Sequence, residues 1–391
     1  MEQPYTIRDF NFWKVSLSLA LASFFVFASM YAVQPLLPVF VETFGVSVST
    51  SSLSLSMTIA GLIVGLLIFG FLSDRLGRTW FIWLSLIGTI IPFLIIPLWD
   101  SFVWLMILRL VQGVALAGLP AASLAYLNEE IDSRSVGAAT GFYISSNALG
   151  GMVGRVMTGY IADHYTWQAS FYVLAGIGVV ILIAVLLMLP KSRYFKPSDL
   201  SLKKDIAGFL VHLKKPLLLP VFGLGIILQL SFTGVWTYLP FYLQGDPFHL
   251  SLEAISYMFL AYSLGVIGSP LAGWLAGNFG LKRVRIIGVV VLSIGIFLTL
   301  FSSLTMIVIG LCVVCLGFFT AHSLTATSVS ETATHHKGSA SSLYLVSYYI
   351  GVSLGSSLMA PVWEGGGWNG VIITAGILPV VYVIAVQFIK K

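Results

Sequence analysis

The chain has 391 residues, of which 58% are hydrophobic and 9% are charged, and its mean hydropathy is +0.97. A soluble protein of this length would aggregate with so much apolar surface, so the composition excludes an ordinary water-soluble domain and predicts an integral membrane protein. The formal net charge of +5 then indicates contact with anionic lipid headgroups and not with nucleic acid.

Apolar runs of about 20 residues, which cross a hydrocarbon layer of about 30 Å, recur along the whole chain. They are predicted to be helices because lipid offers the backbone no hydrogen-bond partners. The first run is too long for the apolar region of a signal peptide, so we expect it to be a true span. The twelve predicted spans are 15–40, 51–71, 80–98, 102–127, 136–160, 169–189, 217–243, 252–276, 284–302, 304–328, 338–361 and 369–389.

The placement of basic residues predicts which side of the membrane each junction faces. With twelve spans, both termini lie on one side. Apart from Arg109 and Arg155, every Lys and Arg falls at the termini or in or beside the even-numbered junctions. By the positive-inside rule this side, with both termini, is predicted to be cytoplasmic in a bacterial-type inner membrane. The opposite junctions hold no Lys or Arg but carry Glu42, Asp100, Asp163, Asp246 and Glu364.

A charged turn, "GFLSDRLGRTW" at 70–80, lies between the second and third spans. Gly70 and Gly77 permit close helix approach and a tight turn. Asp74 is suited to accept hydrogen bonds at the start of another helix, where the dipole favours an anion. A loop that only satisfies the positive-inside rule is the alternative. It would explain Arg75 and the second arginine of the turn, but neither the aspartate nor the two glycines.

The second arginine of this turn, Arg78, is expected to pair with acids at the end of the fourth span. Arg78 and Arg134 are predicted to pair with Glu129 or Glu130. Such contacts, made only while the cytoplasmic face is closed, form a latch. A couple of kcal/mol of differential contact is enough to bias the equilibrium between two conformations.

Three ionisable side chains fall at middle depth in the spans: Arg109, Arg155 and His322. Every Asp and Glu lies at a helix end or in a loop, so no buried carboxylate is available to carry a proton. Burying an ionisable group is costly, which makes the three residues functional candidates. Arg155 lies among glycines where helices pack closely, and we expect it to brace the interface between halves, with substrate contact as the alternative.

His322 is the one of these groups that titrates near neutrality in its unperturbed form. It is either a neutral imidazole bonded to a neighbouring helix, or a proton carrier or substrate ligand. Cys312 and Cys315 form a C-x-x-C in the same span. A metal or redox site there would need further ligands and water access, so two small packing residues are expected and no metal site is predicted.

An internal repeat divides the chain into two halves. "GAATGFY" at 137–143 aligns with "GSASSLY" at 338–344, and the same offset places Glu130 against Glu331. The turn at 70–78 has a second copy at 273–283 in which Gly277 replaces the acid. The predicted domains are a six-helix bundle at 1–189, a cytoplasmic linker at 190–216 with a short interfacial helix, and a six-helix bundle at 217–391.

Three motifs together resemble the major facilitator superfamily: "GFLSDRLGR" at 70–78, "LRLVQGVALAG" at 108–118 and "SNALGGMVGR" at 146–155. The third is similar to the helix-5 motif of the drug:proton antiporter branch, with Met152 near the place of its usual proline. The resemblance implies an all-α membrane protein whose twelve helices form two six-helix bundles with pseudo-twofold symmetry. It also implies that Asp74 meets the helix beginning near Gly338, and that Arg109 lines a central cavity linked to proton transfer. Hydrogen bonding to carbonyls of adjacent helices is the alternative for Arg109.

In this family helices 1, 4, 7 and 10 line the cavity, and helices 5 and 11 flank it. Aromatic walls with a few amide groups suit a moderately hydrophobic solute. The cavity candidates that the resemblance implies are Tyr31, Gln34, Gln112, Asn147, Gln229, Trp236, Tyr238, Phe318 and Tyr348.

The leading hypothesis is therefore a monomeric transporter that exports small organic compounds or drugs against inward proton flow. It requires no cofactor, because the proton gradient supplies the energy. An uptake symporter or uniporter for an organic anion is the alternative, since Arg109 and Arg155 are fixed positive charges. A membrane enzyme is disfavoured because no phosphate-binding loop, H-E-x-x-H motif or large extramembrane domain is present in the sequence.

Overall fold

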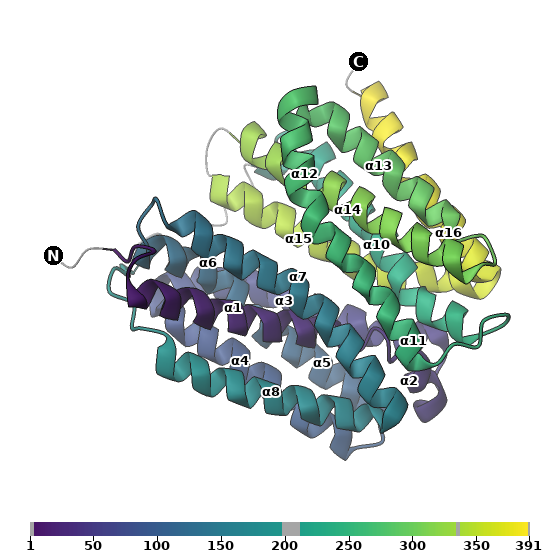
Figure 1. Cartoon of the computed structure of the whole chain (residues 1–391), viewed down its shortest axis with the longest axis horizontal. Coiled ribbons are helices and arrows are strands. Elements are labelled where there is room, and N and C mark those ends of the chain that lie inside the picture. The colour runs from purple at the N-terminus through teal and green to yellow at the C-terminus, as the bar shows by residue number, and fades with distance from the viewer. Residues whose placement is uncertain (1–3, 198–211, 334–336, 390–391) are drawn as a thin grey trace. The chain divides into compact units, whose positions relative to one another are not determined.

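The computed structural model describes residues 4–197, 212–333 and 337–389, and the elements in this part of the chain are helices (Figure 1). The interfacial helix expected in the linker falls largely on 198–211, outside the described residues. By their contacts the residues group into two compact units, one formed by Met1–Phe44 and Met57–Leu200 and the other by Gly45–Ser56 and Ser201–Lys391. The predicted all-α class is confirmed.

The first unit contains the helices of the N-terminal half. In chain order they are α1 (Phe10–Tyr31), α2 (Leu37–Phe44), α3 (Val48–Leu76, whose first turns group with the second unit), α4 (Arg78–Ile95) with the short 3₁₀ helix η1 (Ile96–Leu98), α5 (Phe102–Leu116), α6 (Gly118–Glu130), α7 (Val136–His164) and α8 (Trp167–Met188).

The second unit contains the helices of the C-terminal half. They are α10 (Leu219–Gln244), α11 (Leu252–Tyr257), the 3₁₀ helix η2 (Met258–Tyr262), α12 (Ser263–Phe279), α13 (Leu281–Leu298), α14 (Leu304–Thr332), α15 (Lys337–Ser357) and α16 (Met359–Ile389).

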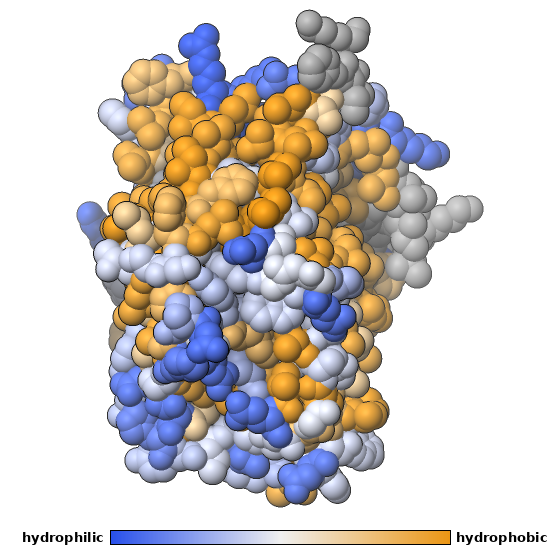
Figure 2. All heavy atoms as spheres, turned by 90° about the vertical axis from the view of Figure 1, so that its right-hand side faces the viewer, coloured by the Kyte–Doolittle hydropathy of each residue, from blue (hydrophilic) through white to orange (hydrophobic). Residues whose placement is uncertain are grey.

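Nine helical segments within the described residues are long and apolar enough to cross a membrane. The other three predicted spans coincide with the helices α7, α13 and α15. The first and last of these are less apolar because they are rich in glycine and serine, and α13 differs because it begins with three basic residues. Large apolar side chains remain exposed on the outer faces of the helices, and apolar side chains cover wide areas of the face in Figure 2. Lipid is the solvent that suits such faces.

The first predicted span, 15–40, is two helices and not one. The helix α1 ends at Tyr31, five residues form turns, and α2 begins at Leu37. Pro35 lies in the interruption, and a proline both lacks an N–H and clashes with the preceding turn of a continuing helix. The N–H of Gln34 donates to the carbonyl of Tyr31, three residues back. The last carbonyls of α1 therefore need donors from elsewhere.

The repeat appears as the same helix contact in each unit. In the first unit α7 packs along α1, and in the second α15 packs along α10. A Cβ added to Gly154 would lie 2.5 Å from the Cα of Ala28 in α1, and one added to Gly150 would also overlap the α1 backbone. Gly351 and Gly355 approach the backbone of α10 equally closely. These glycines allow two backbones to meet where any side chain would separate them.

Candidate functional site

Arg109 closes the broken end of α1. Its side chain is fully buried on α5, and its guanidinium donates to the carbonyls of Ser29 (3.1 Å) and Met30 (2.8 Å) and to Oε1 of Gln112 (2.6 Å). Gln112 in turn donates to the carbonyl of Thr89 at 2.8 Å. A cation at the C-terminal end of a helix also complements the helix dipole. The structure thus places Arg109 on carbonyls of a neighbouring helix, and Gln112 positions it.

Arg155 lies at the same end of α1, approached from α7. Its Nε donates to Oε1 of Gln34 at 2.7 Å, and its guanidinium lies 4.0 Å from the centre of the Tyr31 ring. A second hydrogen bond runs to the carbonyl of Gly151 at 2.6 Å. These contacts of Arg155 tie α7 to the interruption after α1 inside the first unit, and they bring together Tyr31 and Gln34, two predicted cavity residues.

Asn147 lies one turn before this group on α7 and is half-buried. Its Oδ1 has no hydrogen-bond partner among the described residues. A buried amide oxygen without a partner is costly in a packed interior, and its exposure to a polar ligand or water would remove that cost.

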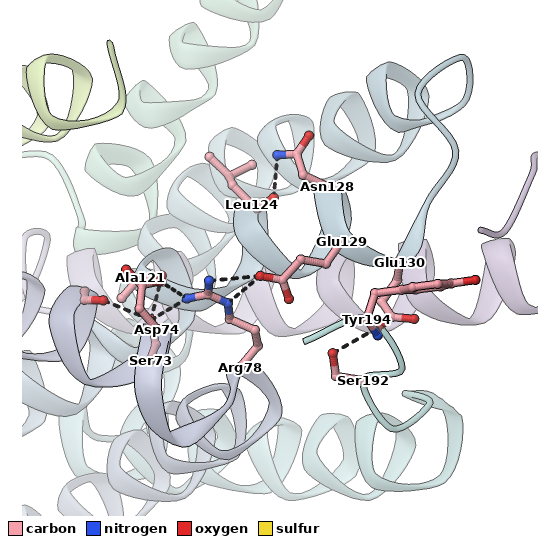
Figure 3. A network of polar contacts seen from close by, with 11 residues as sticks. Ser73, Asp74, Arg78, Ala121, Leu124, Asn128, Glu129, Glu130, Ser192 and Tyr194 are labelled. Atoms are coloured by element: carbon pink, nitrogen blue, oxygen red, sulfur yellow. Dashed lines mark hydrogen bonds and ion pairs between the residues drawn. The ribbon is translucent and has the colours of Figure 1, made fainter. Parts of the chain in front are cut away.

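The charged turn forms a compact network at the junction of α3 and α4 (Figure 3). Arg78, largely buried, pairs with Asp74 one turn earlier and with Oε1 of Glu129 at the end of α6, at 2.9 Å. It also donates to Ser73 Oγ at 3.1 Å. Gly77 links the two helices with φ +105°, a conformation that favours glycine.

Glu130, at the end of α6, does not pair with either of the arginines predicted for it. The Arg78–Glu129 pair is present, but Arg134 is exposed, and its backbone N–H bonds to Asp132. Glu130 pairs instead with Arg193, which follows α8. Arg75 turns back to the carbonyl of Phe71 at 2.9 Å, and nothing within 4 Å would meet a Cβ at Gly70.

Glu130 is the centre of a second cluster, which the sequence did not predict. Its side chain is fully buried and pairs with Arg193 Nε at 3.2 Å. The same carboxylate accepts bonds from the Ser192 hydroxyl and from the backbone N–H groups of Arg193 and Tyr194. The guanidinium of Arg193 lies 3.7 Å from the centre of the Tyr5 ring. This cluster ties the N-terminal segment and the chain after α8 to the end of α6.

In the second unit, α10 carries a buried row of aromatic and polar side chains. Phe232 stacks on Phe318 of α14, with ring centres 3.9 Å apart, and Trp236 stacks on Phe259 at 5.0 Å. Gln229 donates to Thr233 at 3.1 Å. Its Oε1 and the Nε1 of Trp236 have no hydrogen-bond partner among the described residues.

Tyr238, further along α10, is fully buried and donates to the carbonyl of Ser356 at 2.8 Å. Its ring stacks on Trp363. Tyr238 therefore connects α10 to the end of α15 and the first turns of α16.

His322 lies half-buried on α14 in a stack of rings. Its imidazole is nearly parallel to Phe318 (centres 5.5 Å apart, planes 2° apart) and is 4.8 Å from Tyr348. Its Nδ1 is 2.8 Å from the hydroxyl of Tyr344 on α15. Tyr344 was not predicted, although the repeat aligns it with Tyr143 and so offered a signal. The imidazole thus has a hydrogen bond to a neighbouring helix, as expected if it is a neutral packing residue. The same bond is compatible with the other predicted role, that of a proton carrier or substrate ligand.

Cys312 and Cys315, the cysteine pair on α14, are both thiols. Cys312 is half-buried and Cys315 is buried, and no disulfide joins them in the described part of the chain.

Comparison with known proteins gives a consistent family. The family model described as "Major Facilitator Superfamily" matches residues 19–356 and 222–390. The chain is 36% identical over 364 residues to the inner membrane transport protein YnfM of Escherichia coli (strain K12), covering 92% of this chain and 87% of that protein. It is 34% identical over 361 residues to YybF of Bacillus subtilis (strain 168), described as an uncharacterized MFS-type transporter, covering 92% and 89%.

A more distant relative is the multidrug resistance protein MdtG of Serratia proteamaculans (strain 568), 27% identical over 71% of this chain and 70% of that protein. Two solved structures share the fold, each with a TM-score of 0.75. A mutant of the nucleoside transporter NupG is 15% identical over 96% of this chain and 100% of that one. A bacterial homolog of the human lysosomal transporter Spinster is 16% identical over 97% and 96%.

Proposed function

We propose that this chain, which belongs to the Major Facilitator Superfamily, is a secondary transporter that exports small organic compounds in exchange for protons. Family membership makes it a membrane transporter and not an enzyme. The proposal adds the direction of transport, the proton coupling and the residues that serve them. The single observation that carries the coupling is the half-buried position of the His322 imidazole within α14.

His322 is suited to carry the proton because its hydrogen-bond partner tolerates both the neutral and the protonated imidazole. In the sequence no Asp or Glu falls at the middle of a predicted span, and both mid-span arginines already bond to oxygen acceptors. A tyrosine hydroxyl can accept from a protonated imidazole or donate to a neutral one, so the pair tolerates both states. Among these three mid-span groups, imidazole alone titrates between pH 5 and 8 in its unperturbed form.

The proposed solute site is the ring-lined face of α10 and α14. Trp236 Nε1 is a buried donor and Gln229 Oε1 a buried acceptor, and both lack protein partners among the described residues. The stacked rings of Phe232 and Phe318 lie beside them. A flat, moderately hydrophobic solute that offers one acceptor and one donor would satisfy both atoms and stack on the rings.

The proposed cycle is alternating access between two six-helix bundles, residues 1–189 and 217–391, joined by the linker at 190–216. The turn at Asp74 and Arg78 acts as the cytoplasmic latch, and both termini face the cytoplasm. Export is supported by the "SNALGGMVGR" segment, whose Gly150 and Gly154 pack on α1, and by the name of the distant relative MdtG. We expect the monomer to be the transporting unit.

The test uses purified protein in proteoliposomes with an imposed pH gradient and a panel of fluorescent aromatic solutes. For one-to-one exchange, each pH unit is worth about 1.4 kcal/mol and sustains up to a roughly tenfold solute gradient. Solute should accumulate in the compartment with the lower pH and should stop accumulating when an ionophore collapses the gradient. Flux that ignores the gradient would refute the antiporter. Gradient-driven movement of an organic anion together with protons would favour the uptake alternative.

A second measurement isolates His322. His322→Gln should retain solute exchange without a gradient but lose accumulation driven by one, because the glutamine amide cannot take up a proton. Tyr344→Phe is the matched control, since it removes the hydrogen bond and leaves the imidazole titratable. If His322→Gln still concentrates solute as the unaltered protein does, the proton is carried elsewhere.

A further inference from the structure

The second unit contains a cavity of about 700 Å³ at the end that carries the basic α12–α13 turn. The beginnings of α10 and α13 and the ends of α14 and α16 enclose it. Most of its wall is apolar, and a single rim is charged. The apolar lining residues are Leu217, Pro220, Val221, Leu224, Leu281, Ile286, Val289, Val383 and Val386.

The charged rim carries a cation that has no ion-pair partner among the described residues. Arg285, half-buried on α13, donates to Ser328 Oγ at 2.7 Å. Among the residues that the structure describes, no carboxylate forms an ion pair with Arg285 or with the neighbouring Lys282. Glu331, three residues after Ser328 on α14, also lines the cavity, so its rim has two positive charges and one negative. A guanidinium has five N–H donors, and Arg285 uses one of them on Ser328 among the residues that the structure describes.

The repeat-related position in the first unit is closed by the chain itself. Glu130, which aligns with Glu331, is fully buried beneath Ser192, Arg193 and Tyr194. Glu331, in contrast, is exposed and lines an open cavity. Where the first unit has the Glu130–Arg193 ion pair, the second has an open cavity whose charged side chains form no ion pair among the described residues.

We propose that this cavity binds an anionic phospholipid, with the headgroup phosphate on Lys282 and Arg285 and part of one acyl chain along the apolar wall. The positive-inside rule places this end at the cytoplasmic leaflet, where anionic headgroups are concentrated. The volume is within the range of pockets for small organic ligands, and the combination of an apolar wall with convergent cationic donors matches an amphiphile with one negative charge. A free phosphate would use the cations and leave the apolar wall unused.

The site does not depend on the transport activity, so lipid binding is the readout. Purified protein is exchanged into nanodiscs that contain phosphatidylglycerol and phosphatidylcholine with the same acyl chains, and the lipid retained is measured by native mass spectrometry after release into detergent. Arg285→Gln should weaken retention of phosphatidylglycerol roughly tenfold, because it removes a charge-assisted contact. Arg283→Gln is the matched control: it removes the same charge from the same helix start, at a residue outside the cavity lining.

A second pair of variants tests the apolar wall. Val386→Trp fills the cavity from α16 and should also reduce retention, whereas Ile384→Trp, on the same helix but outside the lining, should not. Thermal melting of each variant confirms that it is folded, and Arg285→Lys should retain most of the binding. Equal loss in Arg285→Gln and Arg283→Gln would reduce the effect to surface charge and overturn the proposal. So would displacement of the lipid by millimolar inorganic phosphate, or unchanged retention in Val386→Trp.

Discussion

Neutralising Glu130 tests whether the cluster behind α6 stabilises the first unit. In Glu130→Gln the amide oxygen can take the place of Oε1, which accepts from the Ser192 hydroxyl and two backbone N–H groups. The amide NH₂ then faces Arg193 Nε, a donor, so the ion pair at 3.2 Å is lost. One charged partner remains beside an uncharged and mismatched one.

The size of the effect follows from burial. Removing one partner of a fully buried ion pair costs about 3–5 kcal/mol. The Arg193 side chain is 22% exposed, so water keeps part of its charge solvated, and three of the four hydrogen bonds survive. We therefore expect a loss of about 2–3 kcal/mol, the scale of one hydrogen bond to a charged group. For a unit of this size that is a fall of roughly 5–10 °C in melting temperature.

The assay is thermal unfolding in detergent, with Glu331→Gln as the control. Glu331 is the repeat-related acid, is exposed, and has no ion pair in the described part of the chain, so its replacement should change stability by less than about 0.5 kcal/mol. The double variant Glu130→Gln/Arg193→Gln should be less destabilised than the sum of the single changes. Equal melting temperatures for Glu130→Gln and Glu331→Gln would refute this reasoning.

Two further outcomes follow from the first unit. Gly154→Ala should lower the free energy of unfolding by about 1–3 kcal/mol through overpacking, since the new Cβ would lie 2.5 Å from Ala28. Gly141→Ala, on the same helix, meets nothing within 4 Å and should be neutral or slightly stabilising in the same melting assay. Similar losses of stability for both variants would argue against the close contact. Asp74→Asn should slow solute exchange several-fold. Its effect on the melting temperature should be smaller, because Arg78 keeps Glu129 as its partner. Exchange at the full rate would show that the turn has no gating role.

The sequence predicts most of the helices because lipid imposes a simple length and polarity rule. The exceptions are local backbone events. Span 15–40 breaks at Pro35, span 102–127 is divided at Ala117, and span 252–276 contains a 3₁₀ stretch. The last predicted span begins at 369, but α16 starts at Met359 and kinks at Gly367, where φ is +57°. Hydropathy averages over about 20 residues, so it cannot resolve interruptions of one turn.

The site was predictable as a set of residue types and not as a set of partners. The sequence identifies Asp74, Arg78 and Glu129 because charged side chains at a glycine turn between apolar helices have few possible partners. The sequence does not predict Arg193 as the partner of Glu130, because the two are 63 residues apart. They meet because the end of α8 lies beside the end of α6. The carbonyls that bind Arg109 could not be predicted either, because every residue has a backbone carbonyl and residue type does not show which ones accept a bond.

The interruption after α1 reverses the usual rule for a proline within an apolar helix. Replacing Pro35 with alanine would ordinarily strengthen a helix by restoring a backbone donor. In this chain a continuous α1 would give its terminal carbonyls back to its own backbone N–H groups and deprive the guanidinium of Arg109 of the acceptors that it now uses. Arg109, which is fully buried, would then depend on its bond to Oε1 of Gln112. The irregular backbone thus supplies two carbonyl acceptors to an enclosed cation, and a regular helix in its place would compete for them.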